Sequence, residues 1–254
     1  MDLDLKGRRA LITGGSRGIG LATARALLAE GASVGLCARG GDSLAEAASR
    51  LEAQGGTVFH RTVDVADPAA LTAFVEDTAS ALGGLDILVV NASASVGTGP
   101  DPWGDNFRTD LMSLVTALEA GAPHLERSEV AAVVAIASTS ALEAGILPTA
   151  NSFGALKAAM LQHVSAQARA LGPKGIRVNA VSPGPVYFEG GVWEQIRGAM
   201  PDLYQGAVAS SALGKLASAE DVAAAVAFLA SPAAGHITGT NLVVDGGFTN
   251  RFDY

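Results

Sequence analysis

Cysteine is almost absent from this sequence of 254 residues, with Cys37 as its single example. One cysteine cannot form an internal disulfide, which favours a reducing, intracellular compartment. The four histidines, His60, His124, His163 and His236, do not stand at the spacings of metal ligands. We therefore expect no metal site.

Long apolar runs and an excess of positive charge are also missing. No run approaches the ~20 residues that a membrane-spanning helix needs. The start, Met1-Asp2-Leu3-Asp4, lacks the basic residues of a signal peptide. We expect a cytoplasmic protein with no membrane partner. The net charge of −8 disfavours nucleic acid as a partner, because a phosphate backbone attracts clustered Lys and Arg.

Tyrosine is scarce as well: only Tyr187, Tyr204 and Tyr254 occur, all in the last third of the chain. In contrast, apolar residues are plentiful at 49%, with 17% charged residues. This composition excludes a disordered chain and fits a globular protein with a sizeable core.

Short apolar runs alternate with longer amphipathic stretches along the whole chain. The predicted strands are Arg9–Thr13, Ser33–Ala38, Thr57–Val63, Leu85–Asn91, Val130–Ser138, Ile176–Val181 and Asn241–Asp245. The predicted helices are Gly18–Glu30, Ser43–Gln54, Pro68–Leu82, Trp103–Leu125, Ala150–Leu171 and Ser218–Leu229. This alternation predicts an α/β fold in one domain, residues 1–254: a Rossmann-like, doubly wound parallel sheet of about seven strands. The long excursion Gly184–Leu216 is expected to cover a site.

A glycine-rich loop follows the first predicted strand and opens the first predicted helix. It reads Thr13-Gly14-Gly15-Ser16-Arg17-Gly18-Ile19-Gly20. Such glycines allow a tight turn and a close approach of the backbone to a pyrophosphate, which the helix N-terminus attracts. Because strand, loop and helix occur in order, the pattern predicts a dinucleotide site.

The chain resembles the short-chain dehydrogenases/reductases over nearly its whole length. The resemblance rests on the glycine loop, on Asp64-Val65, on Asn91-Ala92-Ser93, on Arg177-Val178-Asn179 and on Ser182-Pro183-Gly184. Two closing motifs, Ile237-Thr238-Gly239 and Val244-Asp245-Gly246-Gly247, match as well. The resemblance implies an oxidoreductase that works as a homotetramer or homodimer on a small molecule. It assigns cofactor binding to Gly14, Ser16, Arg17, Gly18, Ile19, Gly20, Asp64, Val65, Asn91, Ala92, Lys157, Pro183, Gly184 and Val186.

The end of the second predicted strand predicts which nicotinamide cofactor is used. An enzyme for NAD needs a carboxylate there for the ribose 2′-hydroxyl, but this chain has Cys37-Ala38-Arg39. Arg39 can pair with a 2′-phosphate, and Arg17 can add a second cation. We therefore expect NADP(H) to be favoured over NAD(H).

The catalytic motif differs from that of the family at its tyrosine. Family members use Tyr-x-x-x-Lys, where the phenol donates a proton during carbonyl reduction. This chain reads Phe153-Gly154-Ala155-Leu156-Lys157, so the lysine is present and the phenol oxygen is not. General acid–base catalysis contributes typically about 10²–10⁴-fold. Ordinary carbonyl reduction should be impaired by that factor.

Two further catalytic positions need comment. Asp110 stands where the family has a relay Asn. The catalytic serine is either Ser138, which ends a predicted strand, or Ser140, which has the commoner 13-residue spacing to position 153. Strand-end geometry favours Ser138. For the missing proton donor, the sequence offers Tyr187 first; Glu189, Asp110 and Asn151 are further candidates.

Three explanations of Phe153 remain open. It is an engineered substitution in an active enzyme, a natural residue in an enzyme with non-redox chemistry (isomerase, cyclase or lyase), or the mark of an inactive cofactor-binding protein. The retained Lys157 and cofactor motifs argue against complete decay of the site.

Aromatic residues gather in the excursion that should cover the site. Tyr187, Phe188, Trp193 and Tyr204 fall within 18 residues. They suggest an apolar or ring-containing substrate. Ser93, Tyr187, Phe188 and Trp193 are the predicted substrate contacts.

Overall fold

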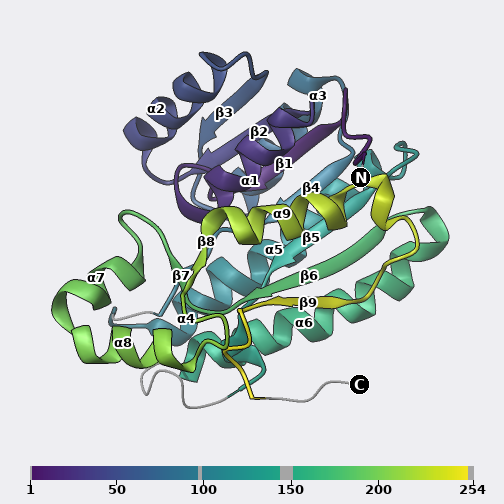
Figure 1. The fold of residues 1–254 in the computed structure, drawn as a ribbon. Helices are drawn as coiled ribbons and strands as arrows, with labels where there is room; N and C mark the ends of the chain where they lie inside the picture. The colour runs from purple at the N-terminus through teal and green to yellow at the C-terminus, as the bar shows by residue number, and fades with distance from the viewer. Residues whose placement is uncertain (1, 97–98, 144–150, 251–254) are drawn as a thin grey trace.

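A parallel sheet of seven strands organises the chain (Figure 1). The computed structural model describes residues 2–96, 99–143 and 151–250. The strand order is β3-β2-β1-β4-β5-β6-β9, and every neighbouring pair is parallel. The strands are β1 (Arg9–Thr13), β2 (Ser33–Ala38), β3 (Val58–Thr62), β4 (Ile87–Val90), β5 (Ala132–Ile136), β6 (Arg177–Pro183) and β9 (Asn241–Val244). The predicted doubly wound sheet is confirmed.

Helices cover both faces of the sheet with two separate apolar layers. One face carries α1 (Gly18–Ala29), α2 (Gly41–Glu52) and α9 (Ala219–Ala230), and α1 lies beside α9 in Figure 1. The other face carries α3 (Pro68–Leu82), α5 (Ser113–Leu125) and α6 (Asn151–Leu171). Short 3-10 turns lie at η2 (Thr139–Ala141), η3 (Gly172–Lys174) and η4 (Pro232–Ala234). Because both faces are covered, the central strands β4 and β5 are continuous buried apolar runs.

The starts of α3 and α9 follow capping signals in the sequence. The Asp67 side chain accepts hydrogen bonds from the backbone N–H groups of Ala69 and Ala70, just before Pro68 opens α3. Ser218 and Asp221 form a reciprocal capping box at the start of α9. Both arrangements satisfy N–H groups that have no partner inside the helix. The predicted start of α6 at Ala150 lies outside the described residues.

The single helix predicted over Trp103–Leu125 is wrong in one respect. The chain forms α4 (Pro102–Asn106), then a π-helical turn η1 (Phe107–Met112), and then α5. Asn106, the last residue of α4, and Asp110, within η1, hydrogen-bond to each other, so two buried polar side chains meet at this turn. Periodicity alone could not show this, because π-turns are set by local tertiary contacts and recur at functional sites.

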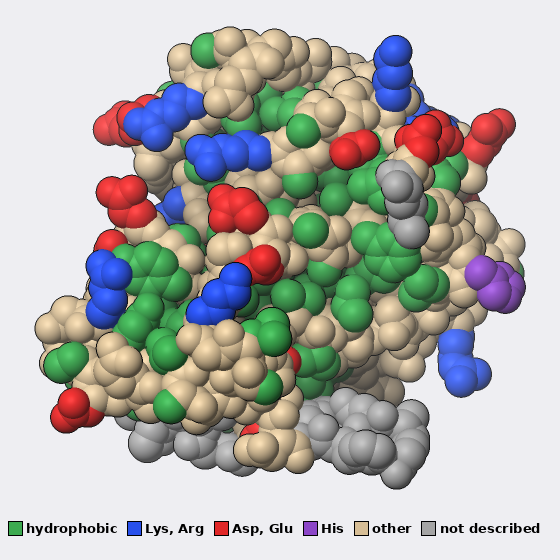
Figure 2. Space-filling model, viewed as in Figure 1, with side chains coloured by type: hydrophobic (Ala, Val, Ile, Leu, Met, Phe, Trp, Pro, Cys, Tyr) green, Lys and Arg blue, Asp and Glu red, His purple; other side chains and the backbone are tan. Residues whose placement is uncertain are grey.

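The excursion after β6 contains structure that the sequence pattern did not predict. It forms β7 (Val186–Tyr187), α7 (Val192–Ala199), α8 (Pro201–Ser210) and β8 (Ala217–Ser218), with β7 paired to β8. We call residues 186–218 the covering segment. It extends from the carboxyl end of the sheet (Figure 1), and Figure 2 shows apolar side chains gathered over α7 and α8.

Cys37 lies buried in β2 and takes no part in chemistry at the surface. Burial raises the pKa of its thiol to about 12, so the thiolate nucleophile is not formed near neutral pH. Within the described ranges, no helix has the length and apolar character needed to cross a membrane.

A buried carboxylate ties the amino ends of the central strands together. Asp86 precedes β4, and its Oδ2 accepts hydrogen bonds from Arg9 Nε at 2.7 Å and from the Arg9 backbone N–H at 2.9 Å. Its Oδ1 accepts from Arg9 Nη2 and from Ser128 Oγ. Burial by itself raises the pKa of Asp86, but these hydrogen bonds outweigh it and hold the pKa below its usual value.

This arrangement predicts an acid-dependent loss of stability. A lowered folded-state pKa gives stability that is present above the unfolded pKa of ~3.9 and is lost as pH falls through the folded value. Asp86→Asn should cost about 2 kcal/mol at pH 7 and should flatten this acid limb. Urea unfolding between pH 3 and 7 measures both. Asp77→Asn, which removes an exposed carboxylate beside Arg61, is the matched control. An unchanged acid limb in Asp86→Asn would contradict the assignment.

Candidate active site

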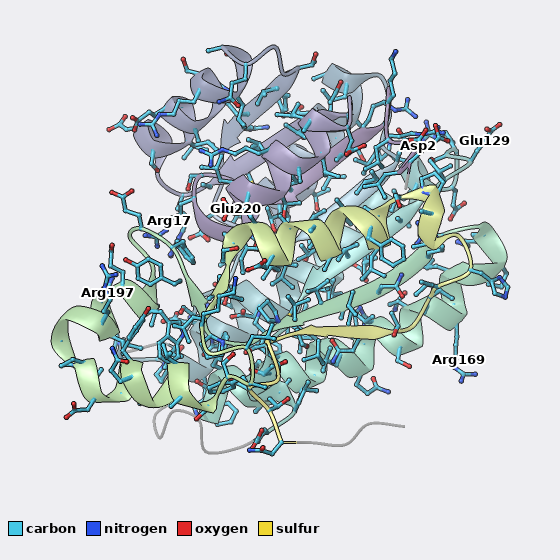
Figure 3. The ribbon with its side chains drawn as sticks, in the orientation of Figure 1. Asp2, Arg17, Glu129, Arg169, Arg197 and Glu220 are labelled. Atoms are coloured by element: carbon cyan, nitrogen blue, oxygen red, sulfur yellow. The ribbon has the colours of Figure 1, made fainter. Side chains whose placement is uncertain are left out.

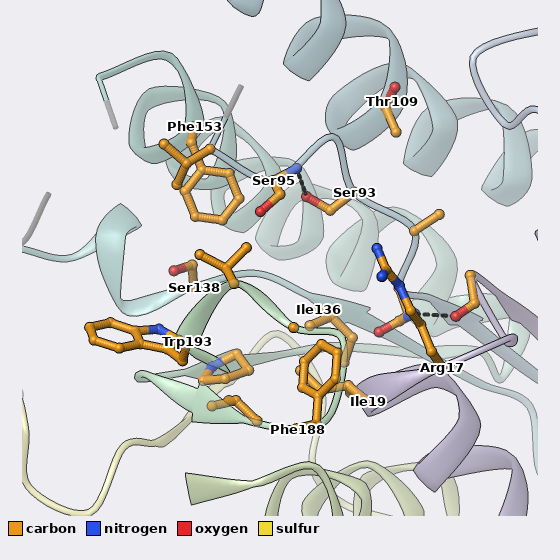
Figure 4. Close-up of a pocket in the computed structure, with 18 of the residues that line it drawn as sticks. Arg17, Ile19, Ser93, Ser95, Thr109, Ile136, Ser138, Phe153, Phe188 and Trp193 are labelled. Carbon is orange, nitrogen blue, oxygen red and sulfur yellow. Dashed lines mark hydrogen bonds between the residues drawn. The ribbon is translucent and has the colours of Figure 1, made fainter. Parts of the chain in front are cut away.

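A cavity of about 660 Å³ opens at the carboxyl ends of the strands (Figure 4). This is where ligands bind in doubly wound sheets, near the point at which the strand order reverses between β1 and β4. Predicted site residues that line it are Gly14, Ser16, Arg17, Ile19, Arg39, Val65, Asn91, Ala92, Ser93, Ser138, Ser140, Phe153, Lys157, Pro183, Gly184, Val186, Phe188 and Trp193.

The glycine loop is clamped to the end of β4. Asn91 Nδ2 donates hydrogen bonds to the backbone oxygens of Thr13 at 2.9 Å and Gly14 at 3.1 Å. Thr13 Oγ1 accepts from the backbone N–H groups of Asn91 and Ala92. Gly14 has φ 71°, and a Cβ on Gly20 would collide with the Gly14 carbonyl oxygen. Glycine is therefore required at both positions.

Two exposed arginines stand over one end of the cavity. Arg39 follows β2 and shares this end with Ser43 of α2, while Arg17 belongs to the glycine loop. Val63 and Val65 supply the apolar wall. Asp64 is not part of the lining, and its carboxylate instead accepts a hydrogen bond from the backbone N–H of Ala66.

These residues fit a nicotinamide dinucleotide. The glycine positions leave a cradle that a Cβ would fill, and the N-terminus of α1 presents N–H groups to an anion. The end of β2 offers a guanidinium where a carboxylate would be needed for a free ribose 2′-hydroxyl. The lining then continues through Ile136 to Lys157.

Lys157 is the charged group at the inner end of the cavity. Its side chain is 2% exposed, and Nζ donates a hydrogen bond to the Ile136 carbonyl oxygen at 2.7 Å. Nζ also lies 2.9 Å from Asp110 Oδ1, as a buried ion pair whose geometry is not that of a hydrogen bond. The Phe153 ring lies one helical turn away, with its centre 5.6 Å from Nζ.

Asp110 lies behind Lys157 and is itself fully enclosed. Its Oδ2 accepts hydrogen bonds from Asn106 Nδ2 at 2.9 Å and from the Ala94 backbone N–H at 3.3 Å. Asn106 Nδ2 also donates to the Ser95 carbonyl oxygen, and Asn106 Oδ1 accepts from Ser152 Oγ. Sequence reasoning missed Asn106, although its four-residue spacing from Asp110 on a helix would have indicated a shared face.

Both candidate serines line the cavity. Ser138 follows β5 in extended backbone, and its Oγ accepts a hydrogen bond from the Ser140 backbone N–H. Figure 4 shows Ser138 between Phe153 and Trp193. The Ser140 backbone instead packs against α6 at Gly154, where a Cβ would lie 2.6 Å from the Ser140 carbonyl oxygen.

The predicted substrate residues separate into two groups. Ser93, Phe188 and Trp193 line the cavity, and the Ser95 backbone N–H donates to Ser93 Oγ (Figure 4). Tyr187 lies outside this lining because its ring packs edge-on against Tyr204 and its hydroxyl donates to Glu194 Oε1. It borders a second hollow of about 400 Å³.

The remaining proton-donor candidates lie elsewhere. Glu189 is exposed and does not line the cavity, and the side chain of Asn151 lies outside the described part of the chain. Lining residues that the sequence did not single out are Ala38, Gly40, Ser43, Val63, Ser95, Val96, Thr109, Ile136, Ala137, Thr139, Pro185, Gly190, Gly191, Val192 and Gln195.

The parallel sheet, the glycine cradle and the cavity define a dinucleotide-binding enzyme of the α/β class. The family model described as Enoyl-(Acyl carrier protein) reductase matches residues 14–249. Isoepoxydon dehydrogenase patN of Penicillium expansum is 39% identical over 251 residues, covering 96% of this chain and 95% of the relative. Cis-4-hydroxycyclohexanecarboxylate dehydrogenase of Sinomonas cyclohexanicum is 34% identical, with coverage of 95% and 96%.

A solved structure shares the fold over nearly its whole length. It is the NADPH-bound short chain oxidoreductase of Pseudomonas aeruginosa PAO1, which contains an atypical catalytic center. The identity is 32% and the TM-score 0.86, with coverage of 96% of this chain and 98% of that one. The chain belongs to the short-chain dehydrogenase/reductase family and is an oxidoreductase of that type.

The buried ion pair predicts strongly non-additive mutant stabilities. Asp110→Ala and Lys157→Met each leave one buried charge without a partner, which should cost about 3–5 kcal/mol. The double variant removes both charges and should cost much less than the sum of the two. A double-mutant cycle by urea unfolding measures the coupling.

The control for this cycle is the exposed pair Glu46–Arg50 on α2. Its coupling should stay near 0.3–0.5 kcal/mol, roughly the range for exposed helix pairs. Additive costs at positions 110 and 157 would contradict a buried ion pair.

Proposed function

We propose that this protein is an NADP(H)-preferring oxidoreductase acting on a carbonyl or alcohol of a small, apolar or ring-containing substrate. The observation that carries the proposal is one cavity that joins Arg39 and the glycine loop to Lys157, Ser138 and Phe153. The bound nicotinamide would supply or accept a hydride at the Lys157 end. Among the named relatives, the cis-4-hydroxycyclohexanecarboxylate dehydrogenase acts on a ring alcohol, which supports a cyclic substrate.

Arg39 is the proposed determinant of cofactor choice. A guanidinium pairs well with a 2′-phosphate, and no carboxylate lines this end of the cavity. The NADPH complex of the Pseudomonas neighbour is consistent with this preference. Arg17, also in the lining, would add a second positive charge.

Replacing Arg39 should therefore discriminate between the two cofactors. Arg39→Ala should weaken NADPH binding about tenfold or more, since a hydrogen bond to a charged group is worth about 1.5–3 kcal/mol, and should leave NADH binding nearly unchanged. Fluorescence titration of both cofactors measures this. Arg25→Ala, which removes an exposed α1 arginine outside the cavity, is the control. Equal losses for both cofactors would overturn the assignment of Arg39 to the 2′-phosphate.

The catalytic proposal gives each remaining group a limited role. The Ser138 hydroxyl would donate a hydrogen bond to the substrate oxygen, and the Lys157 ammonium, paired with Asp110, would line the inner end of the cavity. Phe153 would present an apolar ring to the substrate and donate no proton. With the phenol absent, we propose slow carbonyl reduction in this sequence, because the proton has to reach the substrate oxygen from water.

Restoring the phenol oxygen tests this proposal directly. Phe153→Tyr should raise the reduction of cyclic ketones by about 10²–10⁴-fold, the usual contribution of a positioned general acid. NADPH consumption with a panel of cyclic and linear ketones measures the rate. The control Phe107→Tyr adds the same oxygen on the exposed π-turn.

Two outcomes of the ketone assay would favour other functions. NADPH binding with no turnover in either form would indicate a binding protein. Turnover of other substrates without net NADPH consumption would indicate non-redox chemistry, which the named dehydrogenase relatives do not favour.

The cellular setting and assembly complete the proposal. We propose that residues 1–254 act as one domain in the cytoplasm and assemble as a homotetramer or homodimer. The match of one family model to residues 14–249 supports the single domain. Native mass measurement of the purified protein distinguishes these states from a monomer.

A further inference from the structure

The ring of Phe188 covers the start of α1. Gly18 opens that helix with φ 54°, and a Cβ placed on it would lie 2.7–3.0 Å from three atoms of the Phe188 ring. A Cβ on Gly191 would lie 3.0 Å from two atoms of the same ring. The ring therefore lies between the N-terminus of α1 and that of α7, beside Ile19 in Figure 4.

The covered backbone belongs to the anion-binding part of the cradle. Gly18, Ile19 and Gly20 form the first turn of α1, whose N–H groups have no partners one turn earlier in the helix. A pyrophosphate would use these donors, whereas a phenyl ring supplies no oxygen to accept from them. The Phe188 ring and a bound pyrophosphate would therefore compete for the same backbone surface at Gly18.

Polar contacts hold the covering segment in this closed position. Arg17 Nη1 donates to the Gly190 carbonyl oxygen at 3.0 Å, and Figure 3 shows Arg17 beside the loop that leads into α7. The Gly190 backbone N–H donates to Glu194 Oε2 at 2.8 Å. Arg17, a predicted phosphate contact, is therefore occupied by the same loop that carries Phe188.

We propose that the Phe188 ring blocks the pyrophosphate site at the first turn of α1 and has to move away before the dinucleotide binds. We call this ring the plug; its position thereby sets the affinity for the dinucleotide. Entry of the pyrophosphate requires the ring to leave Gly18 and Arg17 to release Gly190. The apparent dissociation constant is then the intrinsic one divided by the open fraction. This inference rests on the proposed binding of a nicotinamide dinucleotide at this cavity.

The test is a series of side chains at position 188. Phe188→Ala should tighten NADPH binding about tenfold, corresponding to a closed state about ten times as populated as the open one. Phe188→Leu should lie between Ala and Phe. Stopped-flow mixing should show that the tighter NADPH binding comes from a faster association rate, because the ring has to move before NADPH binds.

Two controls separate the plug from other effects. Adenosine 2′-phosphate reaches the Arg39 end but carries no pyrophosphate, so its affinity should change far less than that of NADPH in the Phe188 series. Phe107→Ala removes an exposed ring outside the cavity lining and should leave NADPH binding unchanged. Circular dichroism confirms that each variant is folded, and the Leu variant keeps an apolar group at the site.

Each remaining result has a clear meaning. Weaker or unchanged NADPH binding in folded Phe188→Ala overturns the plug, and a weaker complex with faster dissociation would make Phe188 part of the cofactor's seat instead. If neither the parent protein nor any variant binds NADPH or NADH, the proposed function itself fails.

Discussion

The ion pair between Lys157 and Asp110 is the constraint around which the inner end of the cavity is arranged. Two charges that are almost entirely buried have to be neutralised by each other, because water cannot solvate them. Asp110 in turn needs donors for its second oxygen, which it receives from Asn106 and the Ala94 backbone. Asn106 ends α4 and Asp110 lies in the π-turn that follows, so the donor for the buried charge comes from the preceding helical turn.

This network also limits what Lys157 can do. One of its N–H groups donates to Ile136, and the ammonium is drawn toward Asp110. An asparagine at position 110 would offer no net charge, so the aspartate changes the electrostatics of the cavity as well as its shape. Phe153 stands next to this lysine and has no acidic proton. A free positive charge at Lys157 would therefore have no phenol whose pKa it could lower. The apolar Phe153 ring and the paired Lys157 ammonium therefore fit one another physically.

The sequence was sufficient to predict the sheet, because seven apolar runs alternate with amphipathic stretches and their order requires parallel strands. It also predicted the glycine loop that contacts the end of β4. The need for glycine at positions 14 and 20 arises within the loop itself, because a Cβ on Gly20 would collide with the Gly14 carbonyl oxygen. It did not predict the π-turn, the helices of the covering segment or the role of Asn106. The local spacing from Asp110 indicates a shared face for Asn106, but the contact of Asn106 with Ser152 joins residues distant along the chain and could not be read from periodicity.

The position of Tyr187 shows why composition alone misleads about a site. Four aromatic residues cluster in the covering segment, and adjacent residues of an extended strand point to opposite sides. Val186 of β7 consequently lines the cavity, while its neighbour Tyr187 turns to Tyr204 and Glu194. The scarce tyrosines thus leave the described cavity lining without a phenol at all, and its chemistry has to be carried by hydroxyl, ammonium and backbone groups.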